Sequence, residues 1–123
     1  MPVADYAPRI LVAEDEFIIG CDLCDTVAEA GFVVEGPHET VEAAMRAAAH
    51  QAPDLAILDI RLGSGEVFPL AEQLMAQDVP VIFHSGHVTV DEVHERFPDA
   101  LACAKPCPPA QMIALIDEAL QAH

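Results

Sequence analysis

The sequence predicts an α/β fold of the doubly wound type, with a parallel sheet between two layers of helices. Short apolar runs alternate with helical stretches along the whole chain, which is the pattern of βαβ units. The length of 123 residues suits one domain, and a hydrophobic content of 53% is enough for a core. Right-handed crossovers then place helices on both faces of the sheet.

The first unit begins with an apolar strand over residues 9–13. The helix that follows covers about residues 16–30 and stops at Gly31, since glycine readily adopts the left-handed conformation found just after a helix. We expect the second strand over residues 32–35, where a Gly-Pro pair ends it.

The middle of the chain supplies the central strand between two helices. Thr40 is a good N-cap for an alanine-rich helix over residues 41–50, because its hydroxyl can accept a hydrogen bond from the first turn. The most apolar run, residues 54–59, is the third strand. A Gly-rich loop leads to a helix over residues 67–77, whose proline is tolerated only in its first turn.

The last part of the chain completes the alternation. Residues 79–84 form the fourth strand and residues 90–97 a weak, short helix. A fifth strand over residues 101–104 precedes two prolines that open the last helix, which ends near residue 122. Five strands and five helices are therefore expected.

Polar side chains stand at the ends of four of these strands. Glu14 and Asp15 follow the first strand, Asp59 closes the third, Ser85 follows the fourth and Lys105 the fifth. In an open parallel sheet, ligands bind in the crevice outside the carboxyl ends of the strands. Carboxylates, a hydroxyl and an ammonium at one edge suit Mg²⁺ and a phosphoryl group.

Asp59 is the candidate nucleophile, because a carboxylate can hold a phosphoryl group as an acyl phosphate. Crowded carboxylates repel one another and need a cation, and Mg²⁺ prefers oxygen ligands. We predict Asp15 and Asp59 as direct ligands, with Glu14 binding directly or through water. The backbone carbonyl of Arg61 completes the set.

The remaining strand-end residues suit the phosphoryl oxygens. Lys105 supplies a point charge for one oxygen, the Ser85 hydroxyl can donate a hydrogen bond to another, and Gly86 leaves space beside it. A cis Lys105-Pro106 bond would help to aim the lysine.

Composition limits the partners and the compartment. A formal net charge of −16 argues against nucleic acid and anionic membrane surfaces. No apolar run approaches the ~20 residues of a membrane span, and the start lacks the regions of a signal peptide. We therefore expect a cytoplasmic protein without membrane insertion.

The four cysteines are expected to be reduced thiols rather than a disulfide framework in such a chain. They are Cys21, Cys24, Cys103 and Cys107. Cys21 and Cys24 have the spacing of a redox or zinc motif, but they lie within a helical pattern. Packing is favoured over metal or redox chemistry for this pair.

Taken together, the acidic pair Glu14-Asp15, Leu58-Asp59, Ser85-Gly86 and Lys105-Pro106 resemble the response-regulator receiver domain of two-component signalling. The resemblance covers about residues 9–120, within one domain of residues 1–123. It implies the flavodoxin-like (βα)5 fold with strand order 2-1-3-4-5. With nothing after the last helix, the expectation is a stand-alone receiver, as a monomer or weak dimer.

The resemblance also implies a function. Asp59 would accept phosphoryl from a sensor histidine kinase or histidine phosphotransfer protein, with Mg²⁺ or Mn²⁺ at the acidic pair. Ser85 and Lys105 would sense the group, and Arg61 and His87 would tune its hydrolysis. The chain would catalyse only its own phosphorylation and dephosphorylation, and act by an altered protein contact or as a phosphate sink.

Some positions depart from the family pattern. Glu14 replaces the commoner Asp and Ser85 the commoner Thr. Ala102 stands where an aromatic residue is usual, so the rotating-aromatic switch cannot operate as usually described. Cys107 replaces a bulky apolar residue, and the segment between Ser85 and the lysine is short. An atypical group of single-domain receivers looks similar.

The first helix carries an unusually broad apolar arc. At ~100° per residue, Phe17 and Cys21 lie beside the stripe that faces the sheet, and Ile18 is exposed. This extra surface either packs on a neighbouring helix or docks the phosphodonor protein.

Two other functions fit the residues less well. A Mg²⁺-dependent aspartyl phosphohydrolase typically has a second acid two residues after the nucleophile, where this chain has Arg61. A degenerate receiver that only binds partners would not need Asp59, Asp15 and Lys105 intact.

Overall fold

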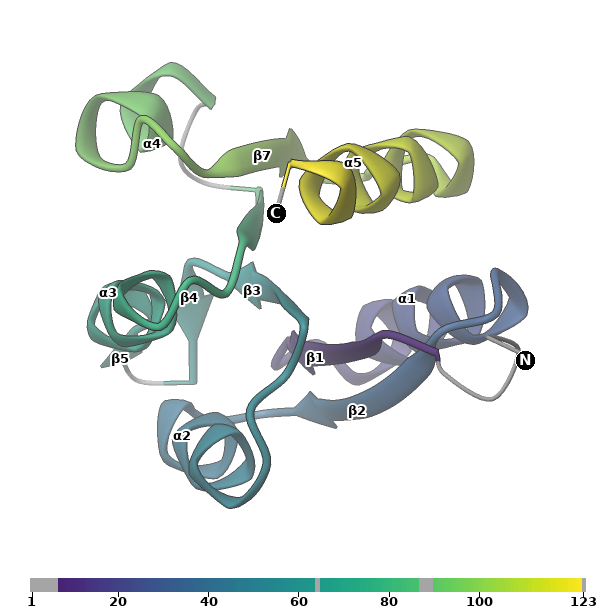
Figure 1. Ribbon diagram of the computed structural model, residues 1–123, viewed down its shortest axis with the longest axis horizontal. Coiled ribbons are helices and arrows are strands. Elements are labelled where there is room, and N and C mark those ends of the chain that lie inside the picture. The colour runs from purple at the N-terminus through teal and green to yellow at the C-terminus, as the bar shows by residue number, and fades with distance from the viewer. Residues whose placement is uncertain (1–6, 64, 87–89, 123) are drawn as a thin grey trace.

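A parallel sheet forms the centre of the computed structural model, which describes residues 7–63, 65–86 and 90–122. Its strands are β1 (Arg9–Ala13), β2 (Val33–His38), β3 (Leu55–Asp59), β6 (Val81–Ser85) and β7 (Leu101–Ala104). They lie in the order β2-β1-β3-β6-β7 (Figure 1). This confirms the predicted order, with β6 and β7 as the expected fourth and fifth strands.

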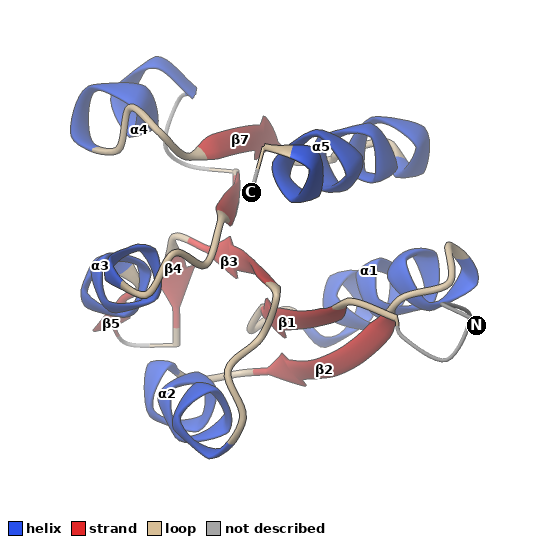
Figure 2. Ribbon diagram, in the orientation of Figure 1, coloured by secondary structure: helices blue, strands red, loops and turns tan. Residues whose placement is uncertain are grey.

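Helices cover both faces of the sheet, as predicted. One face carries α1 (Phe17–Glu29) and α5 (Pro109–Gln121). The other face carries α2 (Val41–His50), α3 (Phe68–Ala76) and α4 (Val90–Arg96) (Figures 1 and 2). No helix among the described residues is long and apolar enough to span a membrane.

The strands divide the core into two clusters, because successive side chains point to opposite faces. Ile10 and Val12 of β1 pack with residues of α1 and α5. Leu11 and Ala13 of the same strand pack with residues of α2, α3 and α4. Every residue of β3 is buried, as expected for the central strand of a sheet covered on both faces.

The helix ends match the expected signals. The Thr40 hydroxyl accepts a hydrogen bond from the Ala43 backbone N–H at 3.1 Å, which caps α2. Gly31 follows α1 with a φ of +99°, the left-handed conformation expected there.

The predicted end of the second strand was wrong, since β2 continues through Gly36-Pro37 to His38. The pairing with β1 shifts register in this region. Gly36 has a φ of +139°, and a Cβ there would lie 2.4 Å from the Val12 carbonyl oxygen. Glycine therefore permits a local irregularity, and an edge strand such as β2 tolerates a proline.

A small antiparallel hairpin stands where only a loop was expected. Its strands are β4 (Arg61–Leu62) and β5 (Gly65–Glu66). Leu62 is buried in the core, while its neighbours Arg61 and Gly63 are exposed. The hairpin thus fixes the chain directly after Asp59.

The expectation that all four cysteines are reduced was wrong for two of them. Cys103 and Cys107 form a disulfide, with their Cα atoms 6.0 Å apart. The turn after β7 brings them within the range that a disulfide needs, which no sequence spacing guarantees. Cys21 and Cys24 are free thiols on α1, and burial raises the pKa of Cys24 to about 11, so the packing interpretation is favoured.

Candidate functional site

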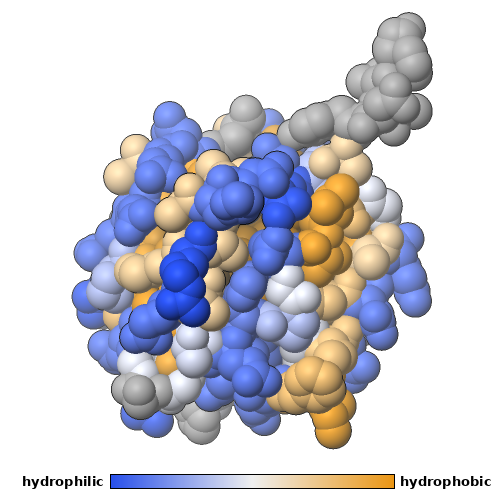
Figure 3. Space-filling model, turned by 90° about the horizontal axis from the view of Figure 1, so that it is seen from below, coloured by the Kyte–Doolittle hydropathy of each residue, from blue (hydrophilic) through white to orange (hydrophobic). Residues whose placement is uncertain are grey.

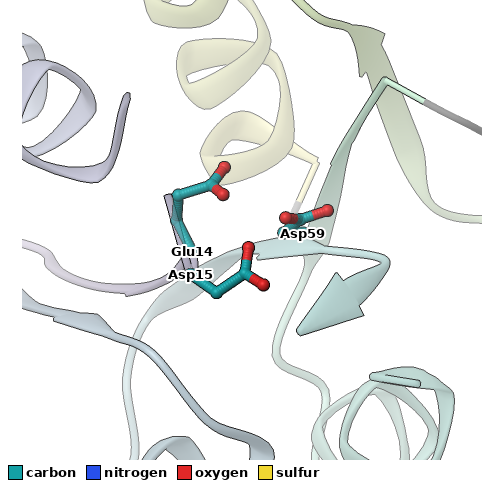
Figure 4. Close-up of side chains that lie close together, drawn as sticks. All are labelled: Glu14, Asp15 and Asp59. Carbon is teal, nitrogen blue, oxygen red and sulfur yellow. The ribbon is translucent and has the colours of Figure 1, made fainter. Parts of the chain in front are cut away.

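The predicted strand-end residues meet at one edge of the sheet. Glu14 and Asp15 directly follow β1, and Asp59 is the last residue of the adjacent strand β3. One ligand atom from each of these three carboxylates lies within 4.8 Å of the others. Figure 4 shows the three side chains gathered at the ends of the two strands.

Lys105, just after β7, reaches across to these carboxylates. Its Nζ lies 2.8 Å from Glu14 Oε1 and donates a hydrogen bond of 3.1 Å to Asp59 Oδ2. A further hydrogen bond of 3.2 Å reaches Glu16 Oε1. The Lys105-Pro106 peptide bond is cis, as the sequence suggested.

Strand alternation explains why Glu14 and Asp59 face the same lysine. Glu14 continues the series Ile10 and Val12, whose side chains face α1 and α5. Asp59 likewise continues the series of residues 55 and 57 on the same face. Glu14 has no exposed surface, and Asp59 is 4% exposed.

Burial and charge push the pKa values of the two carboxyls apart. Burial raises the pKa of Asp59 to about 7, and the nearby Glu14 adds to the rise. Burial also acts to raise the pKa of Glu14, but the close approach of His84 and Lys105 to its carboxylate outweighs burial and lowers the value to about 2. Hydrogen bonding to Glu14 and attraction to Asp59 outweigh burial and hold the pKa of Lys105 above its ordinary value.

Asp15 is the most accessible of the three carboxylates. It is exposed, and its Oδ2 accepts a hydrogen bond from the Gly63 backbone N–H at 3.1 Å. The Arg61 backbone N–H donates to Asp59 Oδ1 at 3.3 Å. These residues line a hollow of about 330 Å³ that Lys105 also borders. Its donors are carboxylate oxygens, which fit a hard cation such as Mg²⁺.

The other predicted site residues lie around this hollow. Ser85 ends β6 and is 5% exposed. Gly86 also lines the hollow, where an added Cβ would be 3.7 Å from Cδ of Lys105. Arg61 is exposed at the rim. His87, predicted to tune hydrolysis, lies outside the described residues.

Two residues of the site were not predicted. His84 pairs with Asp59 in the sheet, is 4% exposed, and places Nδ1 at 3.6 Å from Glu14 Oε1. The alternation of β6 was the signal that could have found it. Glu16 joins through its hydrogen bond to Lys105, and the acidic run of residues 14–16 was its signal.

The start of α1 holds the three residues that were predicted as a possible partner surface. Phe17 is 64% exposed and Ile18 is 76% exposed, whereas Cys21 is half-buried. A larger hollow of about 590 Å³ lies between α1 and α5, with Ile19, Leu23 and Met112 in its lining. It shares Glu16, Gly86 and Lys105 with the smaller hollow.

Comparison with known proteins decides the family. A sequence model of the response regulator receiver domain matches residues 10–117. The chain belongs to the response regulator receiver domain family. The observed strand order and the acidic edge are those that this family resemblance implied.

Receiver domains of known regulators are similar to this one. The phyllosphere-induced regulator PhyR of Methylorubrum extorquens is 37% identical over 120 residues, which are 95% of this chain and 45% of that protein. The transcriptional regulatory protein PdtaR of Mycobacterium tuberculosis is 28% identical over 115 residues, 91% of this chain and 56% of that protein. The chain thus spans about half the length of these relatives.

A solved receiver structure agrees with the fold. The PhyR receiver domain of Erythrobacter litoralis superposes with a TM-score of 0.80 at 28% identity, covering 96% of this chain and 93% of that one. The flavodoxin-like receiver fold therefore holds for nearly the whole chain.

Proposed function

We propose that this receiver domain accepts a phosphoryl group on Asp59 from a phosphohistidine of a sensor histidine kinase or histidine phosphotransfer protein. The observation that carries the proposal is the position of the Asp59 side chain. Its Oδ2 lies 3.1 Å from Lys105 Nζ, and Asp59 lines the same hollow as Asp15. A carboxylate held beside a fixed cation at an accessible edge suits phosphoryl transfer, which depends on positioning and charge stabilisation.

In the proposed reaction, a carboxylate oxygen of Asp59 attacks phosphorus as the P–N bond of phosphohistidine breaks. The imidazole of the donor leaves with the electron pair, and Asp59 becomes an acyl phosphate. Lys105 provides positive charge for one phosphoryl oxygen, and the Ser85 hydroxyl donates a hydrogen bond to another. Water attacking the acyl phosphate returns the carboxylate and releases phosphate.

Mg²⁺, or Mn²⁺, would be held by Asp15, Asp59 and the backbone carbonyl of Arg61. The ion supplies positive charge that offsets the carboxylates and the phosphoryl oxygens. Glu14 suits an indirect role through water, because Oε1 already lies 2.8 Å from the lysine Nζ and Oε2 accepts the Glu16 N–H at 3.1 Å.

Residues beside Asp59 would set the rate at which the acyl phosphate is hydrolysed. Arg61 stands exposed at the rim of the hollow and Gly86 lines it, which supports a role for both in controlling the approach of water. We assign the same role to His87, two residues after Ser85. The output is either a protein contact that phosphorylation alters or the drainage of phosphoryl from a kinase with other targets.

The proposal is tested by intact mass after incubation with Mg²⁺ and a small phosphodonor such as acetyl phosphate. The wild type should gain one base-labile phosphoryl adduct, and Asp59→Asn should gain none. Omitting Mg²⁺ should also abolish the adduct. Asp54→Asn is the matched control that should still be labelled, since Asp54 precedes β3 and bonds to the Arg9 N–H at the opposite edge of the sheet.

An unlabelled wild type would contradict the proposal if a protein carrying phosphohistidine also failed to label it. That result would favour a receiver that only binds partners. Labelling of Asp59→Asn at the wild-type rate would instead place the acceptor on another residue.

A further inference from the structure

We propose that Cys103 and Cys107 form a second covalent modification site, a redox-active dithiol whose disulfide fixes Lys105 for phosphoryl transfer. The functional consequence rests on the proposed role of Asp59 as phosphoacceptor. The chemistry of the cysteine pair itself is independent of that role.

The disulfide encloses the lysine of the site. Cys103 lies in β7, where it pairs with His84 of the neighbouring strand β6. Cys107 lies two residues before the start of α5. The bond therefore joins the last strand of the sheet to the approach of the last helix, with Lys105 and Pro106 in the short loop between.

The sulfurs of Cys103 and Cys107 differ in their accessibility to solvent and small molecules. Cys103 is 3% exposed and belongs to the core beneath α1 and α5. Cys107 is half-buried and lines the hollow of about 590 Å³, which is open enough for a small thiol. Cys107 is thus the sulfur that a small thiol or disulfide meets first, and Cys103 is the resolving partner.

The loop that the disulfide closes carries the lysine that contacts the acidic residues of the site. Lys105 Nζ contacts Glu14 and Asp59 together, at 2.8 and 3.1 Å. Two links hold the backbone around this lysine. The Lys105 N–H donates a hydrogen bond of 2.9 Å to the Ser85 carbonyl oxygen, and the disulfide joins the residues on either side. Breaking the S–S bond removes one of the two links and lets the lysine backbone sample more positions.

The effect on phosphorylation follows from positioning. A cation held within hydrogen-bond distance of the acceptor lowers the cost of assembling the transition state, and small losses of alignment slow such reactions strongly. The disulfide form should therefore accept phosphoryl faster than the dithiol form. We expect a difference of about threefold to tenfold.

The oxidant is a low-molecular-weight disulfide, such as oxidised glutathione. The Cys107 thiolate attacks one of its sulfurs, which forms a mixed disulfide and releases one thiolate. The Cys103 thiolate then attacks the Cys107 sulfur and expels the second. The two cysteine thiols lose two protons and two electrons, and the reagent is reduced to two thiols. A small dithiol reverses the process.

The experiment compares the two redox forms of the full chain. One sample is equilibrated with oxidised glutathione and one with dithiothreitol, and each is freed of reagent. Alkylation followed by intact mass then counts the free thiols, and the phosphorylation rate is measured with Mg²⁺ and acetyl phosphate. We expect two alkylated cysteines in the oxidised sample, four in the reduced sample, and faster labelling of the oxidised one.

Two serine variants identify the cysteines responsible. Cys107→Ser should label at the rate of the reduced wild type in both samples. Cys24→Ser should keep the full redox response, because Cys24 is a free thiol on α1. Circular dichroism shows whether each variant is folded, and reduction of the wild type tests the same bond without any substitution.

The inference is overturned if the oxidised sample shows four reactive thiols, or if both samples label at the same rate. It is equally overturned if Cys107→Ser responds to the reagents as the wild type does. Failure of the proposed function has a different signature. In that case neither sample gains a phosphoryl adduct, while the alkylation count still reports whether the disulfide forms.

Discussion

At the residue scale, Asp59 and Glu14 share one buried corner and one lysine, yet they differ in acidity. Glu14 is stabilised as an anion by His84 and Lys105, which lowers its pKa to about 2 despite its burial. Asp59 is buried beside that anion, and its pKa rises to about 7. Without a divalent cation, the acceptor therefore resists ionisation at neutral pH.

The raised pKa of Asp59 predicts a pH-dependent stability. The folded value of about 7 exceeds the ordinary 3.8, so the folded state binds this proton more tightly than the unfolded state. The stability that Asp59 contributes is therefore complete below pH 3.8 and is lost as the pH rises through 7. In metal-free buffer at pH 8, Asp59→Asn should unfold with a free energy roughly 1–3 kcal/mol higher than the wild type.

Urea unfolding at pH 8 and pH 5 checks this prediction. The advantage of the variant should shrink at pH 5, because the wild-type carboxyl is then mostly protonated in the folded state. If Asp59→Asn is more stable than the wild type by the same free energy at both pH values, the pKa of Asp59 is not raised. The gain in stability then comes from packing.

At the element scale, α1 divides its apolar residues between the core and the surface. Gly20, Leu23 and Val27 are buried against the rest of the protein. Phe17 and Ile18, at the start of the helix, remain largely exposed. Packing on a neighbouring helix therefore does not account for these two side chains, which directly follow Glu16 of the site in the sequence.

We propose that these side chains contact the phosphodonor protein, which predicts the behaviour of Ile18→Asp. Phosphotransfer from a phosphohistidine-bearing protein should slow about tenfold, as expected for an exposed apolar anchor at an interface. Labelling by acetyl phosphate should be unchanged, because Ile18 touches none of the reacting groups.

Rates from the protein donor and from the small donor are compared on the same preparations. Val33→Asp is the matched control, since Val33 is an exposed large hydrophobic residue on the edge strand β2. Equal slowing with both donors would mean that the change acts on the site and not on docking.

At the scale of the whole molecule, negative charge dominates. The formal net charge is −16. On the face shown in Figure 3, blue hydrophilic residues are interspersed with white, tan and orange ones. Self-repulsion of this kind opposes the compact state and is screened by any salt. The cluster of Glu14, Asp15 and Asp59 adds local repulsion between negative charges, which a bound divalent cation would offset.

These two effects can be separated by thermal unfolding in Mg²⁺ and in NaCl of equal ionic strength. NaCl should raise Tm slightly, whereas Mg²⁺ at a hundred times its Kd should add about 2.7 kcal/mol of stability. Asp15→Asn should lose most of the additional Mg²⁺ effect and keep the response to NaCl. Identical responses of the wild type to both salts would contradict a magnesium site.

The sequence by itself determined the alternation of strands and helices, the central strand and the set of residues at the strand ends. These features depend on local patterns: apolar runs, the Thr40 cap and the stop at Gly31 act over a few residues. Because parallel strands share a carboxyl edge, the approximate location of Asp15, Asp59 and Lys105 followed from the same patterns.

Only the tertiary structure decided how these residues are partnered. It brought Lys105 onto both Glu14 and Asp59, buried His84 beside them and joined Cys103 to Cys107. It also showed that β2 continues through Gly36 to His38, whereas the sequence predicted that the strand ends at residue 35. The physical reason is that ion pairs, pKa shifts, bulges and disulfides depend on distances and burial that are set when remote segments of the chain pack together.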